Sequence, residues 1–186
     1  MTPELKDILD GVPIPMAYKI GYISNSYREL SFRAIEARYG LTRPEILSLI
    51  FLYFKDGITA TEICEFSGHL KTNISRAVIA LEKRGMLKRE ADPDDQRRQL
   101  LYITPAGRKQ HDMFMPGLEL REQRMMACLS AREREQLERL LRKMCAHAPE
   151  WNGSPLSMDA PERPALGKGL APHWTRAGSK YPAKEK

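Results

Sequence analysis

The residues best suited to chemistry in this sequence lie together in the segment from 70 to 84. One face of this predicted helix carries four apolar residues at helical spacing, Ile74, Ala77, Val78 and Leu81. Away from them fall short polar and basic side chains, Lys71, Thr72, Asn73, Ser75 and Arg76. Asparagine and arginine can pair with base edges in a DNA groove, whereas serine, threonine and lysine mostly hold phosphates. A plainly solvated helix face has the same composition, and Ile79 on the exposed side has no explanation in this pattern.

A second basic feature follows at residues 86–103. Two short strands are predicted at 86–90 and 99–103, joined by a polar loop with Pro–Asp turn chemistry. Arg97 and Arg98 lie at its tip, beside Asp94 and Asp95. An arginine on a narrow ribbon can enter a minor groove, and an adjacent aspartate can hold its guanidinium. The alternative is a charged hairpin with internal salt bridges.

These two features give the predicted set of DNA-contacting residues. The set comprises Lys71, Thr72, Asn73, Ser75, Arg76, Arg89, Asp95, Arg97 and Arg98.

The elements that must position these residues are mainly helical. We predict six helices and one hairpin, a mainly α winged helix-turn-helix fold with a helical dimerisation region. The dimerisation helices are expected at about 15–39 and 105–147, and the DNA-binding core at about 41–103. Capping boxes beginning at Thr42, Thr59 and Ser130 mark three helix starts. Thr104 and Pro105 mark a fourth, and Pro116 should kink that helix.

The C-terminal segment, residues 149–186, differs from the domain predicted at 1–148. It holds six of the thirteen prolines and four of the twelve glycines, with scattered charges and no apolar periodicity. Such a segment buries too little apolar surface to offset its ordering entropy. We therefore predict a disordered tail.

The composition bounds the class of protein. A formal net charge of +6 favours acidic partners such as nucleic acid, although a basic protein without such a partner has the same balance. We expect no membrane span, no secretion signal and a cytoplasmic location. Cys64, Cys128 and Cys145 are sparse and odd in number, which fits a reducing compartment and ordinary small apolar roles.

An enzyme is not expected. The four histidines, His69, His111, His147 and His173, do not pair with cysteine or serine in a nucleophile motif. No glycine-rich phosphate loop and no cluster with metal-ligand spacing is present in the sequence. We therefore expect no catalytic residues, no metal and no cofactor.

The order and spacing of several motifs resemble the MarR family of transcriptional regulators over about 130 residues. The motifs are Leu41-Thr42-Arg43-Pro44-Glu45, the stretch from Ser75 to Gly85, Asp92-Pro93-Asp94-Asp95-Gln96-Arg97-Arg98, Leu101 to Gly107, and Leu129 to Leu137. The family's D-x-R wing signature matches as Asp95-Gln96-Arg97. Many members carry a second arginine where Gln96 stands, and Arg98 is displaced by two positions, so the roles of the two arginines stay open.

The resemblance implies a homodimer that binds a pseudo-palindromic operator in double-stranded DNA. The first helix and the last two helices of each subunit would interlock. Leu129, Leu137, Leu140, Leu141 and Met144 form the predicted interface. These helices carry more apolar surface than one winged domain can cover, although a purely intramolecular core is the alternative.

The resemblance also implies a small-molecule site between the dimerisation helices and the DNA-binding domain. The first-helix style is most similar to regulators of aromatic-acid catabolism, which makes a small aromatic acid the expected effector and repression the expected output. The ligand-binding candidates are Ser24, Asn25, Tyr27, Arg28 and His111. As alternatives, Tyr27 is plain core, Arg28 a surface charge and His111 a packed histidine. A cysteine-based redox regulator and a ligand-independent architectural DNA-binding protein are the alternative functions.

Overall fold

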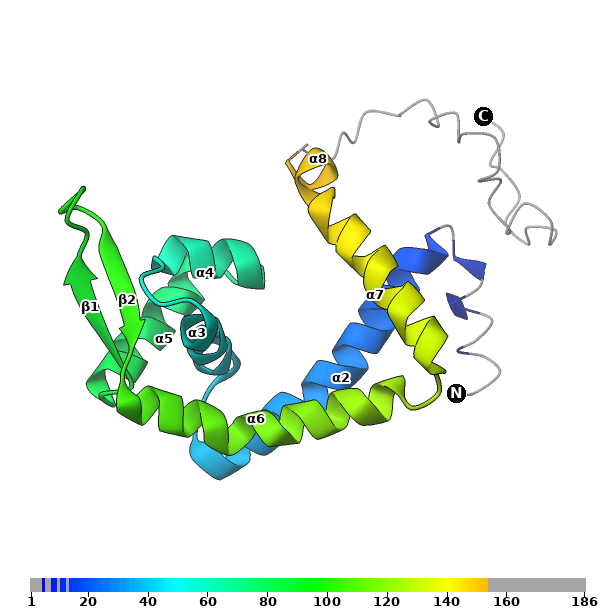
Figure 1. The fold of residues 1–186 in the computed structure, drawn as a ribbon, viewed down its shortest axis with the longest axis horizontal. Helices are drawn as coiled ribbons and strands as arrows, with labels where there is room; N and C mark the ends of the chain where they lie inside the picture. The colour runs from blue at the N-terminus through cyan, green and yellow to red at the C-terminus, as the bar shows by residue number, and fades with distance from the viewer. Residues whose placement is uncertain (1–4, 6–7, 10, 13, 154–186) are drawn as a thin grey trace, which may run out of the picture. The chain divides into compact units, whose positions relative to one another are not determined.

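The computed structural model describes residues 5, 8–9, 11–12 and 14–153 (Figure 1). The chain divides into two compact units. The winged unit is residues 26–127, and the terminal unit joins residues 1–25 with 128–186. Helix α2 (Pro15–Tyr39) contributes to both units, since the boundary falls within it.

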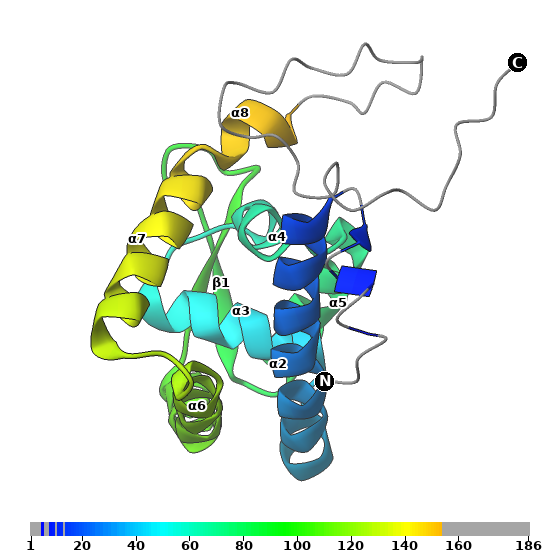
Figure 2. The ribbon, with the colours of Figure 1, turned by 90° about the vertical axis from the view of Figure 1, so that its right-hand side faces the viewer.

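The winged unit is built from five further elements around one apolar core. These are α3 (Arg43–Phe54), α4 (Ala60–Ser67), α5 (Lys71–Lys83), the hairpin β1 (Leu87–Ala91) and β2 (Gln99–Ile103), and α6 (Pro105–Met126). Helix α3 packs against α5, α6 and β2, and α5 packs against α4 and β1. Figures 1 and 2 show α3 surrounded by these elements. Its residues Ile46, Leu49 and Leu52 are fully buried, so α3 forms the centre of the core.

The terminal unit contains α7 (Ala131–Ala146) and α8 (Ala148–Asn152) besides the start of α2. The described residues therefore hold seven helices, one more than the six expected, and α8 is the addition. Helix α8 includes the first residues, 149–152, of the segment predicted as a tail. The rest of the predicted tail, residues 154–186, lies outside the described residues.

Local capping chemistry fixes the helix starts as the sequence predicts. The backbone N–H of Thr42, Thr59 and Ser130 donates to the carboxylate of Glu45, Glu62 and Glu133, at 2.6, 2.8 and 2.8 Å respectively. The Thr104 hydroxyl accepts from the N–H of Gly107 at 3.1 Å, with Pro105 at the first helical position. All three capping boxes and the Thr104 N-cap are confirmed.

The hairpin pairs antiparallel, with Leu87 opposite Ile103 and Ala91 opposite Gln99. Its first strand lies one residue later than predicted. Ile58 adds an isolated antiparallel bridge to Leu101, which the sequence pattern does not reveal. Before it, Asp56 accepts from the N–H of Ile103 at 2.8 Å and from Arg108 at 2.8 Å, so the hairpin is joined to both α3 and α6.

Gly107, in the first turn of α6, permits close packing of this helix against the hairpin. A Cβ on Gly107 would lie 2.1 Å from the carbonyl oxygen of Met86 and 2.7 Å from Cγ1 of Ile103. Because backbone must move to make room, Gly107→Ala should destabilise the protein by about 1–3 kcal/mol or more. Gly117→Ala, inside the same helix with nothing within 4 Å, should instead stabilise it by about 0.5–1 kcal/mol. Urea unfolding at equal protein concentration compares the two variants, and similar effects would contradict this packing.

Candidate nucleic-acid interface

The short helix α4 and helix α5 form the helix-turn-helix. Gly68 adopts a left-handed conformation, φ 66°, as the C-cap of α4, and its N–H donates to the carbonyl of Cys64 at 2.9 Å. A residue with a side chain is strained at this φ, so glycine suits the turn. The chain then reverses into α5 within three residues.

Helix α5 presents the faces that the periodicity predicts. Its buried residues are Ile74, Ala77, Val78 and Leu81, the four assigned to the core. Lys71, Thr72, Ser75 and Arg76 are exposed, and Asn73 is half-buried. Asn73 and Arg76 border a groove of about 250 Å³ whose other wall is Thr42, Pro44 and Glu45 of the α3 start. The predicted α5 residues are therefore gathered on one accessible side of the helix.

Two arginines hold the C-terminal turn of α5. Arg84 donates to the carbonyl oxygens of Gly40 and Tyr39, at 3.0 and 3.1 Å, at the end of α2. Arg89 on β1 pairs with Glu82 on α5, with 2.8 Å between nitrogen and oxygen. Arg89 is one of the predicted DNA-contacting residues, and in this structure its guanidinium joins the wing to α5. The sequence reasoning missed Arg84, whose type and position give no signal of a contact 44 residues away.

The tip of the wing is organised by aspartates in a different way from the one expected. Asp92 is buried, accepts from the N–H of Asp94 at 3.0 Å, and lies 3.7 Å from the Arg98 guanidinium. The Asp95 carboxylate accepts from the backbone N–H of Arg97 at 3.0 Å rather than from a guanidinium. Asp92, not Asp94 or Asp95, therefore holds the arginine side chain that pairs in the loop.

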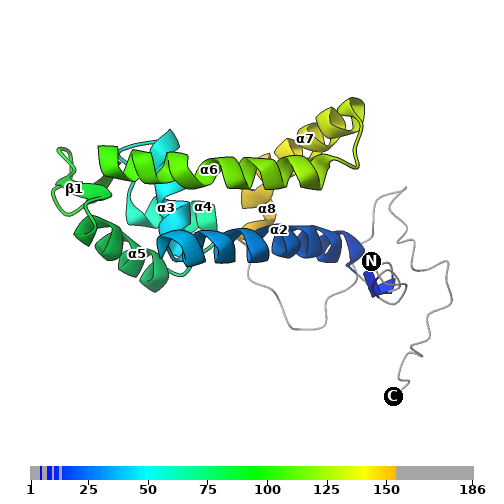
Figure 3. The same ribbon diagram turned by 90° about the horizontal axis from the view of Figure 1, so that it is seen from below.

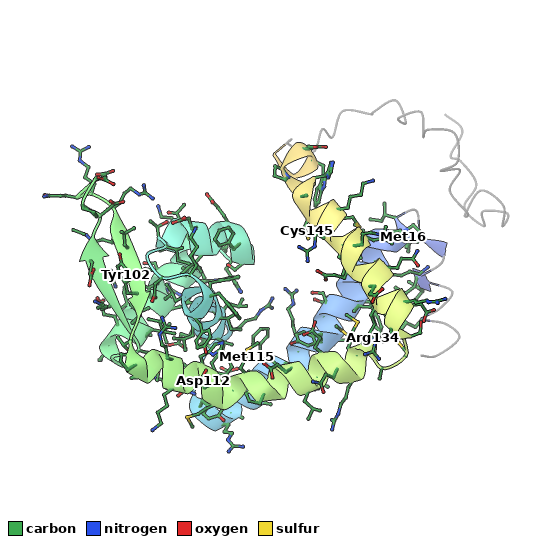
Figure 4. All side chains as sticks on the ribbon, in the orientation of Figure 1. Met16, Tyr102, Asp112, Met115, Arg134 and Cys145 are labelled. Carbon is green, nitrogen blue, oxygen red and sulfur yellow. The ribbon has the colours of Figure 1, made fainter. Side chains whose placement is uncertain are left out.

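Arg97 and Arg98 consequently differ. The Arg98 guanidinium has Asp92 as its partner, whereas the exposed Arg97 side chain makes no ion pair within the described part of the chain. Below the tip, the Lys88 ammonium lies 5.4 Å from the centre of the Tyr102 ring on β2, which Figure 4 labels. The wing thus offers one unpaired guanidinium on a backbone that is fixed by its own hydrogen bonds.

The ligand-binding candidates lie in separate surroundings. Ser24, half-buried, and Asn25, exposed, belong to the terminal unit. In the winged unit the Tyr27 hydroxyl donates to the carbonyl of Leu118 at 3.3 Å, and burial is the main cause that raises the pKa of Tyr27. His111 is only 3% exposed and stacks on Tyr53 with 3.7 Å between ring centres. Its place is that of a packed core histidine.

Arg28 belongs to a cluster of basic groups that the sequence did not reveal. Burial lowers the pKa of Arg43, and the positive charge of Arg28 lowers it further. Burial also lowers the pKa of His69, again with contributions from Arg43 and Arg28. The Arg43 guanidinium lies 5.4 Å from the centre of the Phe32 ring. Three basic side chains, Arg28, Arg43 and His69, therefore share one partly desolvated region.

A separate cavity lies between α2 and α6, two helices that Figure 3 shows in the winged unit. Its volume is about 160 Å³, and its lining includes Leu30, Ser31, Ile35, Arg121 and Arg124. None of the predicted ligand-binding residues lines it. The two arginines are additional candidates for an anion, since apolar walls and guanidinium groups meet there.

Three features define a winged helix-turn-helix DNA-binding protein. They are the helix-turn-helix itself, the hairpin with the unpaired Arg97 at its tip, and the exposed polar face of α5. A sequence profile described as the MarR family matches residues 39–98. Over these residues the chain is similar to the MarR family of transcriptional regulators.

Individual proteins that the chain resembles are also transcriptional regulators. The transcriptional regulator HosA of Escherichia coli O111:H- is 29% identical over 104 residues, which cover 56% of this chain and 77% of HosA. A MarR-family regulator from Silicibacter pomeroyi superposes with a TM-score of 0.66 at 29% identity, covering 72% of this chain and 88% of that one. MepR of S. aureus, solved as a DNA complex, superposes with a TM-score of 0.59 at 25% identity, covering 70% of this chain and 96% of the MepR chain.

Within residues 5, 8–9, 11–12 and 14–153, no helix has the apolar length that a membrane crossing requires.

Proposed function

We propose that this regulator is a homodimeric repressor that a small aromatic acid releases from a pseudo-palindromic operator. The observation that carries the dimer is α7. None of the residues of α7 is buried. Leu140, Leu141 and Met144 are apolar but 49%, 37% and 50% exposed, and they lie with Leu137 on one stripe of the helix. Figure 4 shows α7 with Arg134 and Cys145 labelled. A second copy of the chain, related by a twofold axis, would cover this stripe.

Two winged units in such a dimer would contact two half-sites. In twofold DNA-binding dimers, recognition helices meet half-sites about one helical turn apart, roughly 10 base pairs. Helix α5 would enter the major groove with Thr72, Asn73, Ser75 and Arg76, and Lys71 would lie near a phosphate. Arg97 would enter the adjoining minor groove. The exposure of these side chains supports this arrangement.

The basic cluster of Arg28, Arg43 and His69 supports an organic anion as the effector. Like charges in a partly desolvated region repel one another, and a bound carboxylate relieves that repulsion. A guanidinium also offers two parallel donors to a planar anion. The buried Phe32 ring, 5.4 Å from the Arg43 guanidinium carbon, makes this basic region apolar as well. An aromatic ring with a carboxylate satisfies both features.

The redox alternative finds no support in Cys64. Burial raises the pKa of its thiol, which favours the protonated and poorly nucleophilic form. Cys128 and Cys145 are exposed, but exposure by itself does not make a thiol reactive.

Calorimetry with benzoate- and cinnamate-type acids tests the effector. We expect wild type to bind at least one such acid and Arg28→Ala to bind it at least tenfold more weakly. Arg33→Ala is the matched control, because Arg33 lies on the same helix in an exposed pair with Glu29. By linkage, the acid should weaken operator binding by the factor by which DNA weakens acid binding, typically about 5- to 150-fold.

Three results would contradict this proposed function. One is the absence of binding to any such acid, together with DNA release by peroxide that cysteine-to-serine changes abolish. Another is full binding by Arg28→Ala with loss in Arg121→Ala, which would move the site to the cavity between α2 and α6. The third is activation instead of repression when transcription from the operator is measured in vitro.

A further inference from the structure

Ile79 occupies an unusual position on α5. It is 54% exposed, while Ala77 and Leu81, two residues away on either side, are buried. Successive helical residues are about 100° apart, so Ile79 is turned about 160° from each of them. It therefore lies at the centre of the face that points away from the core.

The neighbours of Ile79 on this face are the polar residues assigned to DNA. Thr72, Ser75 and Arg76 precede it by seven, four and three positions, and all three are exposed. These are the spacings at which helical residues share one side. Known recognition helices use the same i, i+3, i+4, i+7 pattern to reach base edges. Ile79 thus completes this spacing pattern on the exposed side of α5.

The local structure gives Ile79 no other role. It contributes nothing to the buried core of α5, and a β-branched side chain is not favoured on a solvated helix surface. Single exposed apolar residues are common, so exposure alone carries no weight. On the helix surface Ile79 lies between Arg76, which lines the groove, and Glu82, which pairs with Arg89. These neighbours define its surroundings.

The major groove presents one apolar group that matches such a side chain, the C5-methyl of thymine. We propose that Ile79 is a specificity-determining residue that packs against a thymine methyl in each operator half-site. The proposal rests on α5 entering the major groove. The bonds from Arg84 to the end of α2 and from Arg89 to Glu82 hold the backbone of the turn that follows Ile79.

The test replaces thymine by deoxyuridine, which lacks only the methyl group. An operator obtained by selection on the full-length protein is made with single replacements, placed symmetrically in both half-sites. Fluorescence anisotropy then measures affinity for wild type, Ile79→Val and Ile79→Ala. At one thymine position, the loss of the methyl should weaken wild type about fourfold per half-site, or about fifteenfold for the pair. Ile79→Ala should bind thymine and deoxyuridine DNA equally, with Ile79→Val in between.

The outcomes separate this proposal from the assignment of α5. If every replacement affects wild type and Ile79→Ala by the same factor, the contact with the methyl group is refuted. A simultaneous loss of affinity in Arg76→Ala would still support α5 in the major groove. If Arg76→Ala also binds normally, the assignment of α5 fails as well. If Ile79→Ala changes self-association in sedimentation instead, Ile79 is a protein contact and the proposal is overturned.

Discussion

Leu140→Glu should abolish high-affinity operator binding while leaving the winged unit folded. The side chain lies in the apolar stripe of α7, and twofold symmetry would place two new carboxylates in one interface. Burying unpaired charges costs several kcal/mol, so the chains should separate. A separated chain loses the effective concentration that links two half-sites, which multiplies affinity by about 10²–10⁴. We expect a loss of that order.

Sedimentation and fluorescence anisotropy measure this prediction together. Leu140→Glu should sediment as a monomer and bind a two-half-site duplex no better than a single half-site. Arg142→Gln is the control, because it makes the same change in net charge on the opposite side of α7. It removes only an exposed pair with Glu138, which contributes a few tenths of a kcal/mol. A dimeric Leu140→Glu with normal affinity would show that α7 is not the interface.

Arg97→Ala should weaken operator binding at least about tenfold without lowering the melting temperature. The guanidinium is exposed and has no ion-pair partner within the described residues, so its removal leaves the folded chain unaffected. In a minor groove this guanidinium would contribute about 1–3 kcal/mol to the free energy of binding. Because the groove is lined by phosphates, its loss should also reduce the slope of log affinity against log salt concentration by about one. The loss should be larger where A·T-rich flanks narrow the minor groove.

Arg98→Ala provides the matched comparison, since it removes the same charge one residue away. Arg98 pairs with Asp92 in the tip, so we expect a smaller effect on affinity than for Arg97→Ala. Anisotropy titrations at several salt concentrations on A·T-rich and G·C-rich flanks measure both variants. A larger loss for Arg98→Ala would mean that Arg98 leaves Asp92 and enters the groove, which would reverse the roles assigned here.

Local chemistry made most of the fold predictable. The capping boxes at Thr42, Thr59 and Ser130 involve residues three positions apart, and each is present as expected. The isolated bridge of Ile58 was not predicted because its partner, Leu101, is 43 residues away and no local pattern encodes such a pair. Helix α8 was missed because Pro149 and Gly153 suggested a tail, although proline suits the first turn of a helix.

The candidate site was predictable where it depends on helical periodicity and not where it depends on tertiary contacts. The buried face of α5 follows from spacing alone. At the wing tip, three aspartates lie within a few residues, and sequence cannot tell which one meets Arg98. The pairing of Arg89 with Glu82 depends on how β1 turns back onto α5, which helical periodicity does not reveal. The gathering of Arg28, Arg43 and His69 joins segments that are distant in the chain.

The central claim is that a dimer reads two half-sites with α5 and the wing. Hydroxyl-radical footprinting on the selected operator, with the bound stoichiometry measured on the same duplex, tests it most directly. We expect two chains per duplex and two symmetric protected regions about 10 base pairs apart, centre to centre. One chain per duplex with a single asymmetric protected region would contradict it.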